Sequence, residues 1–518
     1  TLKEAHSDTT LLFRPFLAFR NANDLCMEND EADTSVRPCI NGVSTCLYRG
    51  YPELYMQFSK KPEWVSDGHW YKGIEYYKDR DRGIPYKEDL WVPGYFKIPI
   101  KKGETLIFSA STFECDPADF EATYENELKT RTRRTSFYNC LKNSAKQFYL
   151  INRSGMYIMA GYPWYNVRAR DELIALPGCT LAIDHHDDYH KILATFLRAL
   201  YKSLGEHKPD RMIHEIDLPD IPLWTIWTIQ QYRRADGTTE CRKRYGDDVR
   251  RLVEAIRAGE VPNLRLDDNG LLFSQGRDKP VTWLSASIGG KPIIPRTGYI
   301  VEFNALWYNA LRFLISLLEQ ESDQKHYCAE LKALADKTAE SFIATFLNGY
   351  GWLYDYVDGA YTDLEVRPNM AIAIGLEYSP LDRRQRKRVL DMVTRELLTP
   401  KGLRSLSPKS LNYHPNYLGN PTEREYAVHQ WLFGFFADAY FKVFGVSGLG
   451  FIERMLIGYE DEMTEGCIGS LSEMYDANPP FTGRGAVSTA KNVGQILSTI
   501  HTVKELNKLQ TSDNNNPD

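Results

Sequence analysis

Helical periodicity over most of the chain is the feature that most limits how this sequence can fold. From Asp116 to Lys508, apolar residues recur at helical spacing in one segment after another. Long loops rich in Gly, Pro, Trp and Asn connect many of these segments, and such loops are usually functional. The sequence therefore predicts an α/α barrel, with paired helices around a core and loops forming a cleft at one end. The predicted helices span residues 188–205, 222–236, 245–258, 302–319, 323–347, 382–398, 431–444, 448–464 and 486–507.

The first part of the chain has a different pattern. Residues 1–116 contain short alternating or aromatic-rich runs, separated by turn-forming Gly, Pro, Asp and Asn, which predict an antiparallel β-sandwich. Because the chain opens abruptly on the pattern of an interior strand, we expect the start of this domain to be missing, or to be a separate segment of the same gene product. The predicted organisation is a β domain over 1–116, a helical domain over 117–508 and a disordered tail over 509–518.

Composition excludes several classes of function. The net charge of −6 and pI near 6.1 leave no basic footprint for nucleic acid. No run of about 18 apolar residues predicts a membrane span. Nine cysteines without C-x-x-C spacing favour free thiols in a reducing compartment. Aromatic residues reach 13% of the chain, which suits a core and also a cleft that stacks sugar rings.

A single carboxylate stands out in the stretch from Cys467 to Leu497. Glu473 lies among small and polar residues, and Pro479, Pro480, Gly483 and Gly485 then keep the chain irregular until a helical pattern begins at Ala486. An acid on such a loop is well placed to face a cleft. The alternative is a carboxylate that helps to finish a turn.

Two further stretches carry candidate ligand contacts. In AGYPWYNVRARDELIALPG, Trp164 offers a ring face, and Arg170 with Asp171 offers a donor and an acceptor for adjacent hydroxyls. The alternative for that pair is an internal salt bridge at a helix start. In DIPLWTIWTIQQY, Trp224 and Trp227 are a second aromatic pair, although tryptophans at this spacing are also typical of a core.

Later loops add more candidates, each with ordinary loop packing as its alternative. The predicted contacts are Trp283, Arg296, Glu302, Asn304, Trp307, Asn309, Arg367, Asn369, Arg404, Tyr413, His414 and Tyr417. Asn304 and Trp307 are three residues apart, so they share one helix face. His185 and His186 are adjacent, which points them apart and favours a solvated helix start over a metal site. No cofactor motif is present, and we expect neither a metal nor a cofactor.

Taken together, these loops resemble the amylo-α-1,6-glucosidase domain of bacterial glycogen debranching enzymes. The motifs AGYPWY…RDELIALPG, VEFNALWYNAL, RPNMAIAI, GLRSLSP and SEMYDANPP…RGAVSTA occur in that family's order. The resemblance covers about residues 117–508, and LLFRPFLAFR is similar to the family's N-terminal β domain. It implies a mainly α fold, an (α/α)6 barrel preceded by a partial antiparallel β-sandwich.

The resemblance also implies a reaction, the inverting hydrolysis of the α-1,6-linked glucose stub left at a branch point. Such chemistry needs one carboxylic acid and one carboxylate base. Transferred from the family's motifs to the matching positions here, these roles make Glu473 the general base, and Arg170 with Asp171 would hold the terminal glucose. Trp164, Trp283, Asn304, Trp307, Arg367 and Asn369 would line the glucose pocket, and Trp224 and Tyr413 are further substrate contacts. The implied partner is glycogen or another branched α-glucan, and the implied role is cytoplasmic glycogen catabolism.

Three segments depart from the family pattern. The family's T-W-M-D, which carries the general acid, is TWLS here, so Ser285 stands in its place. W-G-R-D becomes Arg168-Ala169-Arg170-Asp171, and Y-H-Q-G-T-V-W-P is rewritten within EREYAVHQW, residues 423–431. A hydroxyl cannot serve as the proton donor for a poor leaving group. Glu302 and Glu425 are the candidate substitute acids, although Glu302 belongs to the family's own VE motif and is expected to hold structure.

Three hypotheses follow. The first is an α-glucan hydrolase of the debranching type, with impaired activity. The second is a non-catalytic α-glucan-binding relative that keeps the sugar contacts and lacks the acid. The third is an enzyme of the same fold with a shifted linkage preference.

Overall fold

The structure, a computed structural model of the whole chain, describes residues 1–21, 24–81, 84–419 and 427–514. It divides into two compact units, Thr1–Thr132 and Arg133–Asp518. The chain thus has a sheet-containing N-terminal region and a mainly helical region. Helix α15 (Ala490–Asn514) continues through part of the predicted tail, and residues 515–518 lie outside the described residues.

The N-terminal unit holds two antiparallel sheets. One has the order β1 (Thr9–Phe13), β6 (Lys87–Ile100) and β5 (Glu63–Glu75). The other has the order β2 (Arg37–Cys39), β3 (Gly42–Thr45), β4 (Leu54–Phe58) and β7 (Phe108–Ser111). Their inner faces share one core, in which Phe58 of β4 packs edge-on against Phe96 of β6 at a ring-centroid distance of 4.9 Å. Facing sheets over a shared apolar core are the defining arrangement of a sandwich.

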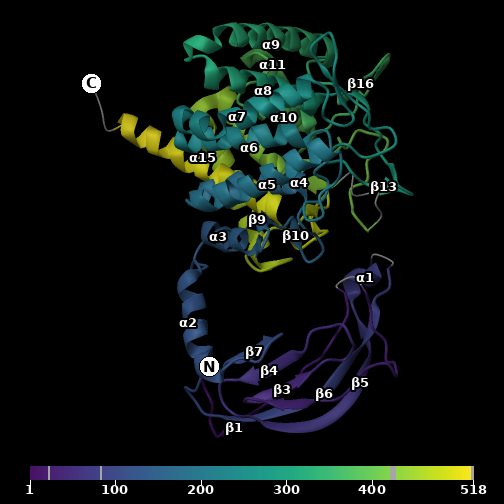
Figure 1. Cartoon of the computed structure of the whole chain (residues 1–518), viewed down its shortest axis with the longest axis vertical. Coiled ribbons are helices and arrows are strands. Elements are labelled where there is room, and N and C mark those ends of the chain that lie inside the picture. Colours follow the sequence, from purple (N-terminus) through teal and green to yellow (C-terminus); the bar gives the residue numbers. More distant parts are fainter. Residues whose placement is uncertain (22–23, 82–83, 420–426, 515–518) are drawn as a thin grey trace. The chain divides into compact units, whose positions relative to one another are not determined.

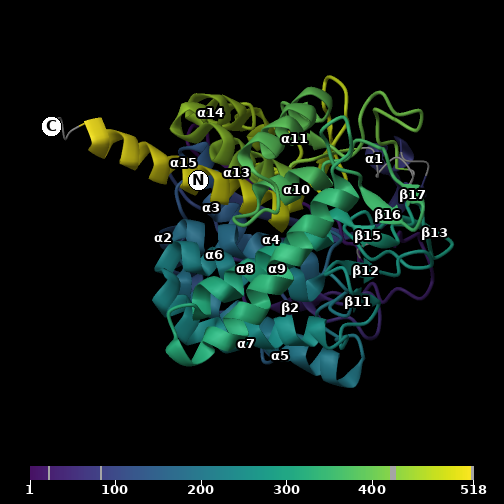
Figure 2. The same cartoon turned by 90° about the horizontal axis from the view of Figure 1, so that it is seen from above.

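The second unit is built from helices that contact one another in a closed cycle. In sequence order the cycle is α4 (Ala169–Cys179), α6 (Ile221–Asp236), α8 (Val301–Leu318), α10 (Asn369–Gly375), α13 (Leu432–Phe444) and α15, which returns to α4. Other helices pack around this cycle: α3 (Phe137–Gln147), α5 (His186–Glu206), α7 (Thr238–Arg257), α9 (Lys325–Phe346), α11 (Arg383–Glu396) and α14 (Leu449–Ile457). Figures 1 and 2 show this stacking from two directions.

The two sets of helices differ in how their side chains are buried. All but one residue of α4 and most of α8 are buried, because neighbouring elements enclose these helices. In α7 and α11, by contrast, buried residues follow a single stripe, and the rest of each helix is charged. The sequence patterns do not predict α4 or α10, because α4 has 11 residues and includes Pro177 and Gly178, and α10 is only 7 residues long.

The first and last helices of the cycle approach each other very closely. A Cβ on Gly178 of α4 would lie 1.7 Å from the carbonyl oxygen of Gly494 in α15, and a Cβ on Gly494 would lie 2.6 Å from the carbonyl oxygen of Ala175. Only glycine at both positions allows this backbone contact.

Short strands gather at one end of the helices, on the right of both views (Figures 1 and 2). One sheet has the order β11 (Leu264–Leu266), β12 (Leu272–Ser274), β15 (Gly298–Ile300), β16 (Tyr356–Asp358) and β17 (Tyr361–Thr362). Another has β18 (Leu398–Thr399), β19 (Gly402–Arg404), β20 (Val428–His429), β21 (Met474–Tyr475) and β22 (Gly483–Arg484). The sequence does not predict these loop strands, because each is too short to show alternation.

One segment, Leu432–Thr464, meets a length and hydropathy criterion for crossing a membrane, with a mean hydropathy of 1.3. In the structure this segment is divided. Helix α13 ends at Phe444, a turn at Gly445–Gly448 follows, and α14 ends at Ile457. Because a spanning helix needs about 20 residues and α13 has 13, the apolar character is explained by packing of α13 in the core.

Candidate active site

The starts of the cycle helices are joined to one another by side-chain contacts. Arg170, in the first turn of α4, binds Asp220, which immediately precedes α6. Lys491, at the start of α15, binds Asp171 of α4 with an Nζ–Oδ1 distance of 2.9 Å. The backbone N–H of Trp431, which precedes α13, donates to the side-chain oxygen of Asn492 in α15 at 3.0 Å. The loops that precede these helices therefore converge on one region.

Glu473 is fixed within this region. Its Oε2 atom accepts a hydrogen bond from the Tyr165 hydroxyl at 2.7 Å and another from the Ala486 backbone N–H at 2.9 Å. The residue is 2% exposed. Gly485 has a φ of +69°, and a Cβ there would lie 2.3 Å from Glu473 Oε2, so a larger residue would displace the carboxylate. The chain around Glu473 is shaped to hold this acid in one position.

The backbone of the Glu473 loop is held as well. The Glu473 N–H donates to the Ala486 carbonyl at 2.8 Å. The Asn492 side-chain amide donates to the carbonyls of Ser472 and Glu473, at 2.6 and 3.0 Å. The first turn of α15 thus sets the position of the loop that carries the acid.

The predicted Arg170–Asp171 pair does not face one ligand as a unit. Arg170 forms a two-pronged ion pair with Asp220, at 2.6 and 2.9 Å, and both side chains are buried. Burial alone would lower the pKa of Arg170, but Asp220 raises it above its ordinary value. Burial acts to raise the pKa of Asp171, but Lys491 and Arg168 outweigh this and hold it below its usual value. Both residues form internal ion pairs, Arg170 with Asp220 and Asp171 with Lys491, and not with each other.

The structure brings Trp283 and Asn369 together. The Trp283 ring N–H donates to the Asn369 side-chain oxygen at 2.6 Å, and the Asn369 amide donates to Asp355 at 2.7 Å. Trp283 also packs edge-on against Trp431, with ring centroids 5.5 Å apart. This contact links Trp283 to the start of α13 and hence to Asn492.

Asn369 contacts a buried network of charged side chains through Asp355. Arg296 pairs with Asp355 at 2.8 Å and with Glu302, and Arg367 lies 3.9 Å from the same aspartate. Glu302 is 1% exposed, and burial raises its pKa against the opposing pull of Arg296. Glu302 is therefore a structural partner of Arg296 here, and a role as proton donor would require breaking that pair.

Three predicted contacts lie in the core. Trp224, Asn304 and Trp307 are 1%, 0% and 0% exposed. The Trp224 ring N–H donates to Asp220 at 3.0 Å, and Asn304 binds the backbone of Leu272. The difference from the expectation has a simple cause: the helix face that Asn304 shares with Trp307 is the inward face of α8, not the face of a pocket.

Asn309 is also buried, at 1% exposed, whereas the remaining predicted contacts lie at or near the surface. Trp164 is partly buried on the loop before α4. The Tyr413 hydroxyl donates to Asn478 at 2.9 Å, and its ring packs against the small cluster formed by Val428, Tyr475 and Ala477. His185 and His186 each contact an aspartate at a helix start, as expected for a solvated position. Glu425 lies outside the described residues.

A cleft of about 560 Å³ opens beside these elements. Ser285 lines it, together with two groups that sequence reasoning missed, the guanidinium of Arg168 and the carboxylate of Glu215. Arg168 lies 3.4 Å from Glu215 and stacks over the ring of Tyr165, with its guanidinium carbon 5.2 Å from the ring centroid. Because the Tyr165 hydroxyl holds Glu473, Arg168 and Tyr165 connect the cleft to the fixed carboxylate. The full lining is Arg168, Glu215, Leu218, Lys279, Pro280, Ser285, Ala286, Ser287 and Tyr417.

Glu215 has an unusual backbone. Its φ of +64° is in the left-handed region, which a glutamate rarely adopts and which is often retained at functional sites. Arg168 and Arg170 are both near its carboxylate, at 3.4 and 3.9 Å. The sequence around it, MIHEIDLPD, has no turn-forming residue at this position, so nothing in the pattern marks Glu215.

Comparison with known proteins agrees with the features described above. A profile described as "Glycogen debranching enzyme N terminal" matches residues 1–107, and one described as "Amylo-alpha-1,6-glucosidase" matches residues 134–498. The protein is thus of the glycoside hydrolase type. More narrowly, the chain belongs to the amylo-α-1,6-glucosidase family of glycogen debranching enzymes.

Individual relatives are distant. The glycogen debranching enzyme of Saccharomyces cerevisiae is 26% identical over an alignment 217 residues long, and the match covers 33% of this chain and 14% of that protein. The crystal structure of a GH63 mannosylglycerate hydrolase from Thermus thermophilus has a TM-score of 0.48 at 12% identity, covering 71% of this chain and 100% of its own. An uncharacterized conserved protein from the same organism has a TM-score of 0.46 at 14% identity, covering 70% and 99%.

Proposed function

We propose that this protein hydrolyses the α-1,6-linked glucose stub at branch points of glycogen or a related α-glucan, with inversion at the anomeric carbon. The observation that carries the proposal is the position of Glu473. Its carboxylate is held by two donors where the loops of the matched family segment converge, next to a cleft of a size that suits sugar units. The closed cycle of helices supports the (α/α)6 barrel that the family resemblance implies.

In this mechanism Glu473 is the general base. A water molecule attacks the anomeric carbon, its proton passes to Glu473, and the bond from that carbon to the leaving oxygen breaks. A proton must reach the leaving oxygen from the opposite side. The products are free glucose and an unbranched chain. Tyr165 and the Ala486 N–H hold Glu473 for this step, and positioned hydrogen bonds of this kind cost no reorganisation during reaction.

We assign proton donation to Glu215. A serine hydroxyl is too weak an acid to replace the family's aspartate, and Glu215 is the one carboxylate among the described residues that line the cleft with Ser285. To donate a proton, Glu215 must lose its contact with Arg168 when the glucan enters. The 3.4 Å separation and the roughly one-third exposure of both side chains favour such a rearrangement.

The direct test uses phosphorylase limit dextrin as substrate and free glucose as the readout. We expect release by the native chain and a fall of about 10²–10⁴-fold in Glu473→Gln and in Glu215→Gln. Circular dichroism would establish that both variants are folded. Absence of glucose above the Glu473→Gln background in the native protein would reject hydrolysis of this linkage.

A second candidate function is glucan binding without catalysis. Two observations favour it: Ser285 lies in the cleft where the family resemblance expects the acid, and Glu215 is paired with guanidinium groups. In that case the native chain binds dextrin without releasing glucose, and Ser285→Asp creates activity. If native protein already releases glucose from dextrin and Ser285→Asp does not change the rate of release, this second function is rejected.

The cysteines support a cytoplasmic location for this activity. All nine are free in the structure, which suits a reducing compartment. Subcellular fractionation of the source cells would test this, and recovery of the chain outside the reducing compartments would contradict it.

A further inference from the structure

A groove continues away from the cleft along the helical surface. The cleft shares Leu218 with a second cavity of about 360 Å³. That cavity in turn shares Leu204, His207 and Glu260 with a third, of about 250 Å³. The groove therefore runs from Ser285, over the segment that connects α5 to α6, to the ends of α5 and α7.

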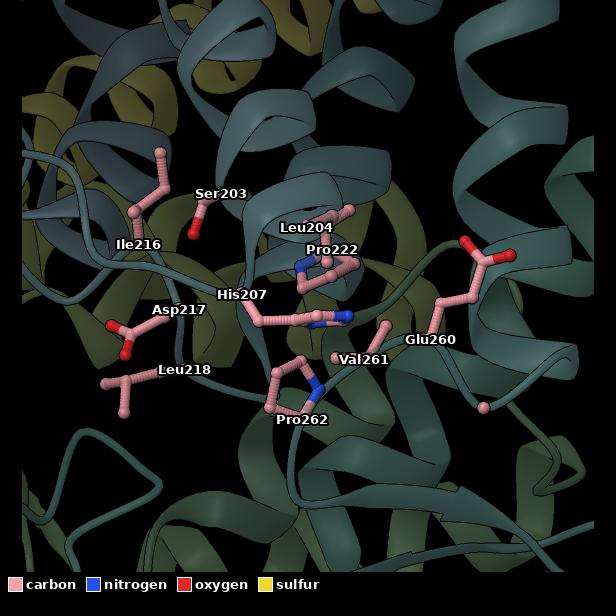
Figure 3. A pocket seen from close by; sticks show the side chains of 11 residues that line it. Ser203, Leu204, His207, Ile216, Asp217, Leu218, Pro222, Glu260, Val261 and Pro262 are labelled. Atoms are coloured by element: carbon pink, nitrogen blue, oxygen red, sulfur yellow. The ribbon is translucent and has the colours of Figure 1, made fainter.

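The middle of the groove combines flat apolar surfaces with polar edges. Figure 3 shows the His207 ring between Pro222 and Pro262, with Asp217 and Glu260 toward opposite sides. His207 ends α5 with a φ of +53°, a left-handed conformation that sets where its ring lies. Apolar faces bordered by hydrogen-bonding groups match a pyranose, whose ring has C–H faces and a rim of hydroxyls.

The polar groups of the groove are available to a ligand. Within the described parts of the chain, the side chains of His207, Asp217 and Glu260 have no hydrogen bond or ion pair. Asp217 and Glu260 also give this part of the groove a negative character, which opposes anionic polymers and phosphorylated ligands. Carboxylates accept hydrogen bonds from hydroxyls, so a neutral polyol is the fitting ligand.

We propose that this groove, from Leu218 to Glu260, binds the linear α-1,4-glucan chain that bears the branch stub. The direction in which the glucan chain leaves the cleft rests on the hydrolysis proposed above. A stub in the cleft leaves its main chain beside Glu215, and the groove begins three residues further along the same segment, at Leu218. The groove then holds the main chain of the glucan, which is the part of the substrate that leaves after the stub is cleaved.

Three changes to the full chain test the groove. Leu204→Trp fills the junction of the two outer cavities, Asp217→Ala with Glu260→Ala removes the hydroxyl acceptors, and His207→Asn removes the ring while tolerating the left-handed backbone. Asp247→Ala is the matched control, because Asp247 is an exposed carboxylate of α7 that does not line the groove. Thermal unfolding monitored by circular dichroism checks that each variant is folded.

The measurement is calorimetric binding of maltotriose and maltoheptaose. In the native chain the longer sugar binds more tightly, because it reaches the groove. We expect this gain to fall by about three- to tenfold for each set of groove changes, and to persist in Asp247→Ala. A general loss of structure would weaken both sugars alike, so the chain-length dependence is the diagnostic quantity.

The outcomes separate the two proposals. If native protein releases glucose from limit dextrin but the groove variants bind maltoheptaose with native affinity, the groove is rejected and hydrolysis stands. If native protein releases no glucose yet the groove variants lose the chain-length gain, the groove stands and hydrolysis is rejected. Equal affinity of the native chain for both sugars also rejects the groove.

Discussion

Two sides of the candidate site differ in how firmly the protein holds them. We call Tyr165, Glu473, Gly485, Ala486 and Asn492 the Glu473 side, and Arg168, Glu215, Ser285 and Tyr417 the Ser285 side. Glu473 is 2% exposed and bound through both backbone and side chain, whereas Arg168 and Glu215 are about 30% exposed and lie 3.4 Å apart.

The difference suggests distinct tasks for the two sides. The Glu473 side is preorganised, so the position of its carboxylate does not depend on a ligand. The Ser285 side has longer, more solvated contacts that a ligand can replace at little cost. A change in chemistry is therefore easier to accommodate at the Ser285 side.

The largest expected effect comes from the buried ion pair between Arg170 and Asp220, which contrasts with the more exposed pair between Arg168 and Glu215. Arg170→Met leaves Asp220 buried without its partner, and we expect a loss of about 3–5 kcal/mol in the free energy of unfolding. Arg168→Met, on the Ser285 side, should cost only about 0–1 kcal/mol. Urea denaturation of the full chain measures both. Similar losses in the two variants would show that the buried pair is no more important for stability than the exposed one.

The next effect concerns the hydrogen bond that holds Glu473. Tyr165→Phe removes a donor to an ionised group, which is worth about 1.5–3 kcal/mol. We expect kcat for glucose release to fall by about ten- to a hundredfold, together with a comparable loss in the free energy of unfolding. Tyr299→Phe, which removes a tyrosine hydroxyl bound to the Asp267 carboxylate, is the control. An unchanged kcat in Tyr165→Phe would show that the Glu473 side is held without this tyrosine.

Gly485→Ala separates backbone strain from displacement of the acid. The left-handed backbone costs about 1–3 kcal/mol with a larger residue, and the added Cβ would lie 2.3 Å from Glu473 Oε2. Gly359→Ala provides the same kind of strain, with a φ of +60° and no neighbour within 4 Å. Both variants should unfold at lower urea concentration, but only Gly485→Ala should also lose glucose release. Equal activity in the two would mean that the carboxylate tolerates the shift.

A further effect is a pH dependence of stability. Burial raises the pKa of Glu172, the neighbour of Asp171, to about 8. The folded state therefore binds a proton that the unfolded state releases above its ordinary pKa, near 4.5, so this group lowers stability as pH rises toward 8. The slope is at most about 1.4 kcal/mol per pH unit. Glu172→Gln should gain stability over native protein at pH 8 relative to pH 5, and a constant difference across that range would contradict the raised pKa.

The fold can be predicted from the sequence wherever one helix face is polar. Periodic charge identifies α7 and α11, but α4 falls outside the predicted helices because it is short and includes Pro177 and Gly178, which are poor helix formers. The strands at the end of the helices escape prediction for a different reason, since runs of 2 or 3 residues carry no pattern.

The site is predictable in part. Glu473 stands out because an acid on an irregular loop before a helix is unusual, and Trp283 with Asn369 lies together as expected. The roles assigned to these residues remain predictions. Asn304 and Trp307 share a face, but spacing does not tell an inward face from a pocket. Glu215 carries no local signal, because its position depends on the meeting of loops far apart in sequence.

The close backbone contact between Gly178 and Gly494 has a consequence for biosynthesis. During translation α4 is made early, but the cycle of helices cannot close until translation has passed residue 494 in α15. Asn492, which anchors the loop of the acid, emerges only just before that point. A nascent chain therefore cannot form the surroundings of the Glu473 carboxylate before α15 is made. A ribosome that stalls before α15 yields a product that lacks these surroundings.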